Sequence, residues 1–333
     1  MGQTIGVVAL AGGHLMSDLV IATAAMKRPV PLVIDRSVDS ASNAFGTEDL
    51  LHADEELALD LQVLAGVAVD ARLVVYFAPN TLQGLTDAVH DAATDTANRP
   101  SVLSVSWGSA ERFWSAAARD AMQAALSDAA VANVTVVAAA GDDLATAGLT
   151  DGAAHVLFPA SSPYVLACGG TQMTFSAAGG SLAGEAVWNE GFVGTGGGVS
   201  DVFAMPAYQR SAGLPPSVND GRKRRGLPDV AAAAASAPGY RIVVNGEERT
   251  RDGTSAAAPM WAGLIALANA ARGRHLGLVH PFLYSNSWLC HGITDGNNRV
   301  QGLGYDAGSG WNACAGLGSP RADELVKALA AIP

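Results

Sequence analysis

The stretch "RLVVYFA", residues 72–78, decides the fold class, because this short apolar run follows directly on the helical pattern of residues 54–67. Short continuous apolar runs are typical of strands that are buried on both faces of a sheet. Three similar runs are "TIGVVAL" (4–10), "SVLSVSW" (101–107) and "VTVVAAA" (134–140), and further helical patterns cover residues 82–94 and 112–131. This alternation predicts an α/β fold, with a mainly parallel sheet covered by helices on both sides.

The composition is that of a globular protein with a large core. The chain has 333 residues, of which 49% are hydrophobic and 15% charged, and its formal net charge is −11. An acidic chain of this kind is a poor partner for nucleic acid or an anionic membrane, and we expect it to bind neither. We find no repeat, low-complexity linker or charge block, so we expect one domain spanning residues 1–333.

The ends and the cysteines narrow the choice of compartment only slightly. No apolar segment is long enough to span a bilayer, and the opening "MGQTIGVVALAGG" lacks the features of a signal peptide. Cys168, Cys290 and Cys314 are an odd number without CxxC spacing, which indicates neither a zinc site nor a disulfide framework. A single bridge between Cys290 and Cys314 stays open.

A Gly-Thr-Ser turn runs straight into a helix of small residues in "RDGTSAAAPMWAGLIALANAA", residues 251–271. Ser255 in this turn is either a helix cap or a nucleophile. Asp142 follows the apolar run 134–140, and ligands of parallel sheets bind at the carboxyl ends of the strands. Taken alone, Asp142 is more typical of a turn or an N-cap.

A serine nucleophile needs a base, and none of the seven histidines lies in a His-Gly-Thr-His setting. Glu56 and Asp60 stand four residues apart in "DEELALDLQVLAG", so both carboxyl groups lie on one face of the predicted helix. A solvated acidic helix start, favoured by the helix dipole, is the alternative. Asp60 argues against it, because this carboxylate falls among apolar residues where it needs a partner.

Taken together, these segments resemble the sedolisins, or serine-carboxyl peptidases, and in particular the kumamolisin-like branch. The resemblance covers nearly the whole chain, and several of its motifs are long and in the family's order. They are "LDLQVLAGVAVDARLVVYFAPNT", "SVLSVSWGSAE", "VTVVAAAGD", "FPASSPYVLACGGT", "TGGGVS", "GLPDVAA", "DGTSAAAPMWAGL" and "GWNACAGLGSP". A Gly-Thr-Ser turn alone would be a weak signal.

The resemblance implies a subtilisin-like fold with a mainly parallel seven-stranded sheet flanked by helices. It also implies roles for four residues: Ser255 as nucleophile, Glu56 as general base, Asp60 as the group that orients Glu56, and Asp142 as oxyanion-hole residue. Trp107 matches a tryptophan that lies near these acidic residues in the branch. An ordinary aromatic residue of the hydrophobic core is an equally good interpretation of Trp107. The implied activity is that of an acid-acting endopeptidase.

The chemistry explains why such a site works in acid. Glu56 can take the serine proton only when it is ionised, whereas Asp142 can donate a hydrogen bond to an oxyanion only when it is protonated. Asp60 shares a proton with Glu56 and raises the apparent pKa of one of the pair. We therefore expect this mixed protonation state, and with it the activity, at acidic pH.

Three departures from the family pattern bear on this expectation. Ala9 stands where the branch has a glutamate that extends the acidic network, and Asp143 replaces a serine and is expected to perturb the pKa of Asp142. The family's N-terminal pro-region, which keeps members inactive until acidified, is missing from this sequence, so we expect that it was removed or lies outside it. A homologue that binds peptides with little turnover, and an esterase or acyltransferase using Ser255, are the alternative functions.

The family's calcium loop differs most from the pattern. In "HGITDGNN" (291–298) and "GWNACAG" (311–317), Gly292 and Asn312 replace two ligating aspartates. The carbonyl groups of Ile293, Gly308 and Gly310 remain, but calcium usually needs charged oxygens among its six to eight ligands. Asp295 is near in the sequence and could compensate. We predict no calcium and no other cofactor, with the loop held by Asn312 and by packing of Trp311.

The expected partners are a peptide or protein substrate and a pro-region acting as inhibitor, with the chain itself a monomer. Leu157 in "HVLFPASSP" is expected to form an apolar wall near the substrate channel. The resemblance implies a secreted protein, whereas the opening sequence lacks a signal peptide. Secreted and cytoplasmic locations therefore both stay open.

Overall fold

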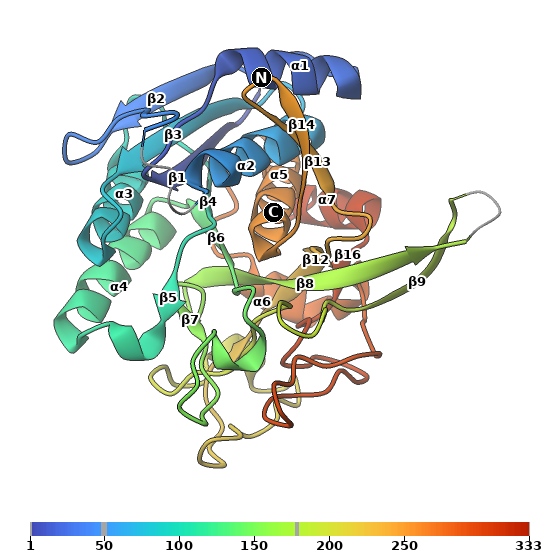
Figure 1. The fold of residues 1–333 in the computed structure, drawn as a ribbon. Helices are drawn as coiled ribbons and strands as arrows, with labels where there is room; N and C mark the ends of the chain where they lie inside the picture. The colour runs from blue at the N-terminus through green and yellow to red at the C-terminus, as the bar shows by residue number, and fades with distance from the viewer. Residues whose placement is uncertain (1, 48–51, 177–179, 333) are drawn as a thin grey trace.

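A seven-stranded parallel sheet forms the centre of the molecule (Figure 1). The computed structural model describes residues 2–47, 52–176 and 180–332. The predicted mainly parallel sheet is confirmed, with β9 added antiparallel to β8 at one end. In sheet order the strands are β12 (Val230–Ala233), β8 (Val165–Phe175), β6 (Thr135–Ala139), β4 (Val102–Val105), β1 (Thr4–Leu10), β3 (Arg72–Ala78) and β2 (Val33–Ser37). Strand β9 (Leu182–Val187) lies outside this order and pairs with β8.

Strand β1 shows how the sheet buries both of its faces. Ile5, Val7 and Ala9 belong to one hydrophobic cluster, which includes side chains of α2, α5 and α7. Val8 and Leu10 point the other way, into a cluster with α3 and α4. The helices are α1 (Met16–Met26), α2 (Ala53–Val67), α3 (Leu82–Thr94), α4 (Ala116–Val131), α5 (Thr254–Arg272), α6 (His280–Ser285) and α7 (Ala322–Ala330).

The predicted elements agree closely with the structure where the hydrophobic pattern is strong. Strands β1 and β3 and helix α3 have the expected bounds, and β4 and β6 lie within the expected runs. The helix expected from residue 112 begins instead at Ala116, because Ser115 caps it by accepting a hydrogen bond from the Ala118 N–H at 3.1 Å. A short 3-10 turn, Glu111–Phe113, occupies the preceding residues.

Helix α5 packs closely against α2, and a glycine permits this approach. A Cβ atom at Gly263 would lie 2.7 Å from Cγ1 of Val67 on α2, a distance that carbon atoms do not tolerate. On its other side, Trp261 is fully buried and donates from Nε1 to the carbonyl of Ala231 on β12 at 2.9 Å. These contacts fix the central part of α5 relative to α2 and the sheet.

Short antiparallel pairs surround the main sheet. The pair closest to α5 in the chain is the hairpin of β13 (Tyr240–Val244) and β14 (Glu247–Arg251), which leads directly into that helix. Strands β8 and β9 extend away from the body as a long ribbon (Figure 1). The remaining pairs are β5 (Ser109–Ala110) with β7 (Leu157–Phe158), β10 (Gly198–Val199) with β11 (Gly226–Leu227), and β15 (Cys290–His291) with β16 (Ser319–Pro320).

The three cysteines are buried free thiols, so the bridge between Cys290 and Cys314 that the sequence left open does not form. Cys314 instead donates from Sγ to the carbonyl of Tyr305 at 3.2 Å. Among the described residues, no helix has the length and apolar character needed to cross a membrane.

Candidate active site

Ser255 is the second residue of α5 and is 7% exposed. The residue that caps the helix is Gly253, with a φ of 118°, and it provides no side chain for the purpose. The Ser255 hydroxyl is therefore not the N-cap that the local sequence allows. It acts on Glu56 instead, because its proximity lowers the pKa of that carboxyl group.

Asp142 follows β6 and lies against the first turn of α5. Its Oδ1 atom accepts hydrogen bonds from the backbone N–H of Thr254 at 2.7 Å and from the Thr254 hydroxyl at 2.6 Å. A Cβ atom at Gly253 would lie 2.7 Å from Oδ2 of Asp142. A glycine at position 253 therefore provides both the positive φ and the space that this carboxyl group occupies.

The pKa of Asp142 is raised above its ordinary value. Burial is the main cause, and the negative charges of Asp143 and Asp252 add to it, while hydrogen bonds from Thr254 act in the opposite direction. The expectation that Asp143 perturbs this group is confirmed, and the direction favours a protonated Asp142. A protonated carboxyl group can donate a hydrogen bond as well as accept one.

Glu56 and Asp60 both lie on α2, one turn apart, and both have raised pKa values. Burial and the charge of Asp142 raise the pKa of Glu56 to about 7, against hydrogen bonding from Ser255 and Ser106. Asp60 is fully buried, and its pKa is raised by that burial and by the charge of Glu56. The structure thus brings the four predicted residues into one electrostatically coupled group.

Ser106, which follows β4, is a member of this group that the sequence analysis missed. Its hydroxyl donates to Oδ1 of Asp60 at 2.8 Å and lies 3.3 Å from the backbone carbonyl of Ser255. Asp60 accepts this hydrogen bond, and no direct one between Asp60 and Glu56 is present among the described residues. A polar residue at the carboxyl end of a buried parallel strand was the signal that could have identified Ser106.

Two buried oxygen atoms of the group lack hydrogen-bond partners within the described part of the chain. They are Oε1 of Glu56 and Oδ2 of Asp60. An unpaired buried carboxylate oxygen is costly, whereas a proton on either carboxyl group would let it donate. The pair is therefore arranged to hold a proton, in agreement with the direction of both pKa values.

Glu55, next to Glu56, connects α2 to the hairpin that leads to Ser255. Its buried carboxylate forms ion pairs with Arg249 and with Arg251, whose Nε donates at 2.7 Å. Gln62 on the same helix exchanges two hydrogen bonds with the backbone of Val243, at 2.7 and 2.9 Å. These contacts hold α2, which carries Glu56, and the segment that leads to Ser255 together.

The acidic start of α2 is not the solvated surface that the sequence offered as an alternative. Asp54 is 4% exposed and accepts hydrogen bonds from the N–H groups of Gly13 at 2.6 Å and Gly46 at 2.8 Å. Glu55 is 3% exposed. Each acidic residue in this turn therefore has a specific structural role.

The remaining predicted residues divide between the site and the core. Trp107 is partly buried and packs against the hydrophobic cluster under α3 and α4, as expected of a core aromatic. Ala9 is buried in the cluster on the opposite face of the sheet. Leu157 lies against Gly141, the neighbour of Asp142, because a Cβ atom there would come within 2.7 Å of its Cδ1. Leu157 thus lies next to the candidate oxyanion residue, and the apolar wall of a substrate channel stays a prediction.

The loop that resembles a calcium site is closed by an amide. Asn312 donates from Nδ2 to the carbonyl groups of Ile293 at 3.0 Å and Gly308 at 3.3 Å, two of the oxygens a cation would need. Its Oδ1 accepts from the N–H groups of Cys314 and Ala315. Trp311 donates to the carbonyl of Pro228 at 3.0 Å, and the side chain of Asp295 is exposed. The residues present do not fit a calcium ion, because the NH₂ group of Asn312 already donates to two of the carbonyl oxygens that would have to bind it.

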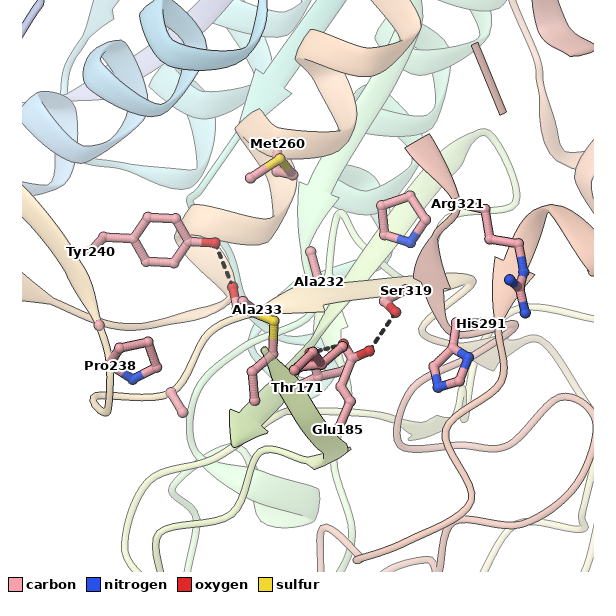
Figure 2. Close-up of a pocket in the computed structure, with 15 residues that line it drawn as sticks. Thr171, Glu185, Ala232, Ala233, Pro238, Tyr240, Met260, His291, Ser319 and Arg321 are labelled. Carbon is pink, nitrogen blue, oxygen red and sulfur yellow. Dashed lines mark hydrogen bonds between the residues drawn. The ribbon is translucent and has the colours of Figure 1, made fainter. Parts of the chain in front are cut away.

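A cavity of about 590 Å³ lies near the base of the β8–β9 ribbon, beside Met260 of α5 (Figure 2). Within it, Glu185 accepts hydrogen bonds from Thr171 at 2.6 Å and Ser319 at 2.8 Å, and Tyr240 donates to the Ala233 carbonyl. None of the four predicted catalytic residues lines it. The cavity is separate from the carboxyl group cluster around Ser255.

The sequence profile of the Subtilase family matches residues 40–280, which include Glu56, Asp142 and Ser255. The chain belongs to the subtilase family. Within the subtilases it is a member of the kumamolisin-like sedolisins: kumamolisin from Bacillus sp. (strain MN-32) is 45% identical over 98% of this chain and 60% of its own length. Sedolisin from Pseudomonas sp. (strain 101) is 31% identical over 95% of this chain and 56% of its own length.

A solved structure of Pseudomonas sedolisin, complexed with two molecules of pseudo-iodotyrostatin, matches this subtilase with a TM-score of 0.83 at 29% identity. The match covers 98% of this chain and 91% of that one. The predicted subtilisin-like fold is thereby confirmed. The chain spans 60% or less of the length of both curated relatives, kumamolisin and sedolisin.

Proposed function

We propose that this chain is an acid-acting serine-carboxyl endopeptidase, with residues 1–333 as one catalytic domain. The observation that carries the proposal is the coupling of Glu56, whose pKa is raised to about 7, to the buried Ser255 at the start of α5. A buried carboxyl group with a raised pKa beside a serine has the properties of a general base. The relatives named kumamolisin and sedolisin support a peptide or protein substrate.

In the proposed reaction, Oγ of Ser255 attacks the carbonyl carbon of the scissile bond and its proton passes to Glu56. The carbonyl electron pair moves to oxygen, and the protonated Asp142 donates a hydrogen bond to this oxyanion. When the intermediate collapses, the proton on Glu56 passes to the leaving amine and an acyl-Ser255 remains. Water then repeats the sequence, with Glu56 as base, and releases the acid product.

The two protonation requirements support each other electrostatically. The negative charge of Asp142 is one cause of the raised pKa of Glu56. When Asp142 is protonated this charge is absent, so Glu56 ionises at a lower pH. Protonation of Asp142 therefore lets Glu56 ionise at a lower pH than it would beside an ionised Asp142, and this mixed state is the one that the proposed chemistry needs.

We propose further that no metal ion takes part and that the C-terminal loop is held by Asn312. Its amide already satisfies the carbonyl groups of Ile293 and Gly308. A pro-region acting as inhibitor remains a proposed partner, and we propose that the catalytic domain is a monomer.

The experiment that tests the function is a pH-rate profile on a peptide library, read by mass spectrometry, for the wild type and Ser255→Ala. We expect internal peptide bonds to be cleaved in acid by the wild type alone. Binding without cleavage would indicate an inactive homologue, and cleavage of matched esters but not peptides would indicate an esterase. Either outcome contradicts the proposal.

A further inference from the structure

We propose that Ser106 is a positioning residue of this site: its hydroxyl donates to Oδ1 of Asp60 and holds that carboxyl group beside the backbone of Ser255. This inference rests on the proposed function, because it assigns Ser106 a part in preparing Glu56 and Asp60 for proton transfer. It is carried by three observations: a short hydrogen bond, a second contact with the nucleophile's own carbonyl group, and a proline within α5.

The hydrogen bond to Asp60 is the stronger of the two contacts. The Ser106 hydroxyl has one proton, and the distances from its Oγ are 2.8 Å to Oδ1 of Asp60 and 3.3 Å to the Ser255 carbonyl. A hydroxyl donates preferentially to the nearer and more negative oxygen. With Oδ1 engaged in this way, Oδ2 of Asp60 is the atom left to share a proton with Glu56.

Pro259 explains why the carbonyl group of Ser255 faces Ser106. In a regular helix this carbonyl would accept from the N–H of the residue four positions later, which is Pro259 and has no N–H. A proline ring also pushes away the carbonyl group four residues before it, which here is that of Ser255. The Ser255 carbonyl is thereby free to lie near the Ser106 hydroxyl, so one side chain spans the nucleophile's helix and the base's helix.

Removing the Ser106 hydroxyl should change the ionisation of the pair and not only its geometry. The hydrogen bond from Ser106 lowers the pKa of Asp60, and the Ser106 hydroxyl also lowers the pKa of Glu56. The other groups that act on the pair are Ser255 and Asp142, which change the pKa of Glu56, and Glu56 itself, whose charge raises the pKa of Asp60. Loss of the Ser106 hydroxyl leaves these groups in place and removes an interaction that stabilises the ionised carboxylates. Glu56 then ionises at a higher pH.

The test is the pH dependence of kcat/KM for Ser106→Ala beside Ser104→Ala. Ser104 is a matched control, because it lies two residues earlier, is fully buried and has a hydroxyl without a hydrogen-bond partner in the described structure. For Ser106→Ala we expect the acidic limb to move up by about one pH unit and kcat to fall about tenfold, with KM little changed. Ser104→Ala should keep the wild-type limb.

Ser106→Thr, which keeps the hydroxyl, should restore most of the wild-type profile. If Ser106→Ala does not fold, Ser106→Cys provides the same test, since a thiol of similar size donates only weakly. An unshifted acidic limb in the folded variant, or an equal shift in Ser104→Ala, would overturn the inference while leaving the proposed function intact. A wild type without Ser255-dependent hydrolysis at any pH would instead refute the proposed function.

Discussion

Replacing Glu56 by Gln should stabilise the fold at neutral pH and have little effect in acid. The pKa of Glu56 rises from 4.5 to about 7 on folding, so the folded state binds its proton more tightly than the unfolded state does. As pH increases through this window, the wild type loses stability that a neutral Gln does not lose. At about 1.36 kcal/mol per pH unit, the loss amounts to about 3 kcal/mol, an upper limit because Asp142 titrates with Glu56.

The assay is urea denaturation between about pH 4 and pH 8, in a Ser255→Ala background that prevents self-digestion. Glu55→Gln is the matched control, because the pKa of Glu55 is lowered despite burial by its ion pairs with Arg251 and Arg249. A lowered carboxyl pKa stabilises the fold at pH values above 4.5, and this stability disappears in acid. Glu55→Gln should therefore be less stable than the background protein at neutral pH. If the free energy of unfolding of Glu56→Gln changes with pH in parallel with that of the background protein, the reasoning is refuted.

Asp142→Asn should keep a larger share of its maximal activity at higher pH than the wild type, because an amide donates at any pH; superimposable scaled profiles would contradict this. Ser255→Ala should abolish hydrolysis and lower the free energy of unfolding by no more than about 1 kcal/mol, since its hydroxyl caps no helix end. EDTA should leave activity and melting temperature unchanged, and a drop reversed by calcium would show an occupied site. Asn312→Asp should lose about 2 kcal/mol of stability through its two lost donors, and a variant as stable as the wild type would contradict this.

The central strands could be predicted because their signal is local, whereas the four site residues needed the family resemblance as well. Strands β1 and β3 are continuous apolar runs, and Glu56 and Asp60 share a helix face. Strand β2 gave no such signal, because its sequence "VIDRS" lies at the sheet edge with alternating exposed residues. Local pattern thus reveals buried central elements better than half-exposed edges.

The supports of the site could not be predicted, because they join residues far apart in the chain. Glu55 meets Arg251 across 196 residues, and its local context is typical of a helix start that favours acidic side chains. Ser106 meets Asp60 across 46 residues, and the two become neighbours only in the fold, where α5 packs against both β4 and α2. The family resemblance pointed to the candidate site residues, whereas the contacts that hold them required the structure.

The most direct test of the central claim is rapid acid quenching of the enzyme during turnover of a peptide ester at about pH 4, followed by peptide mass mapping. The account predicts that the acyl group appears on the peptide containing Ser255 in the wild type, and that Glu56→Gln accumulates far less of it. An acyl group on another residue, or hydrolysis that proceeds at the wild-type rate in Ser255→Ala, would contradict the account.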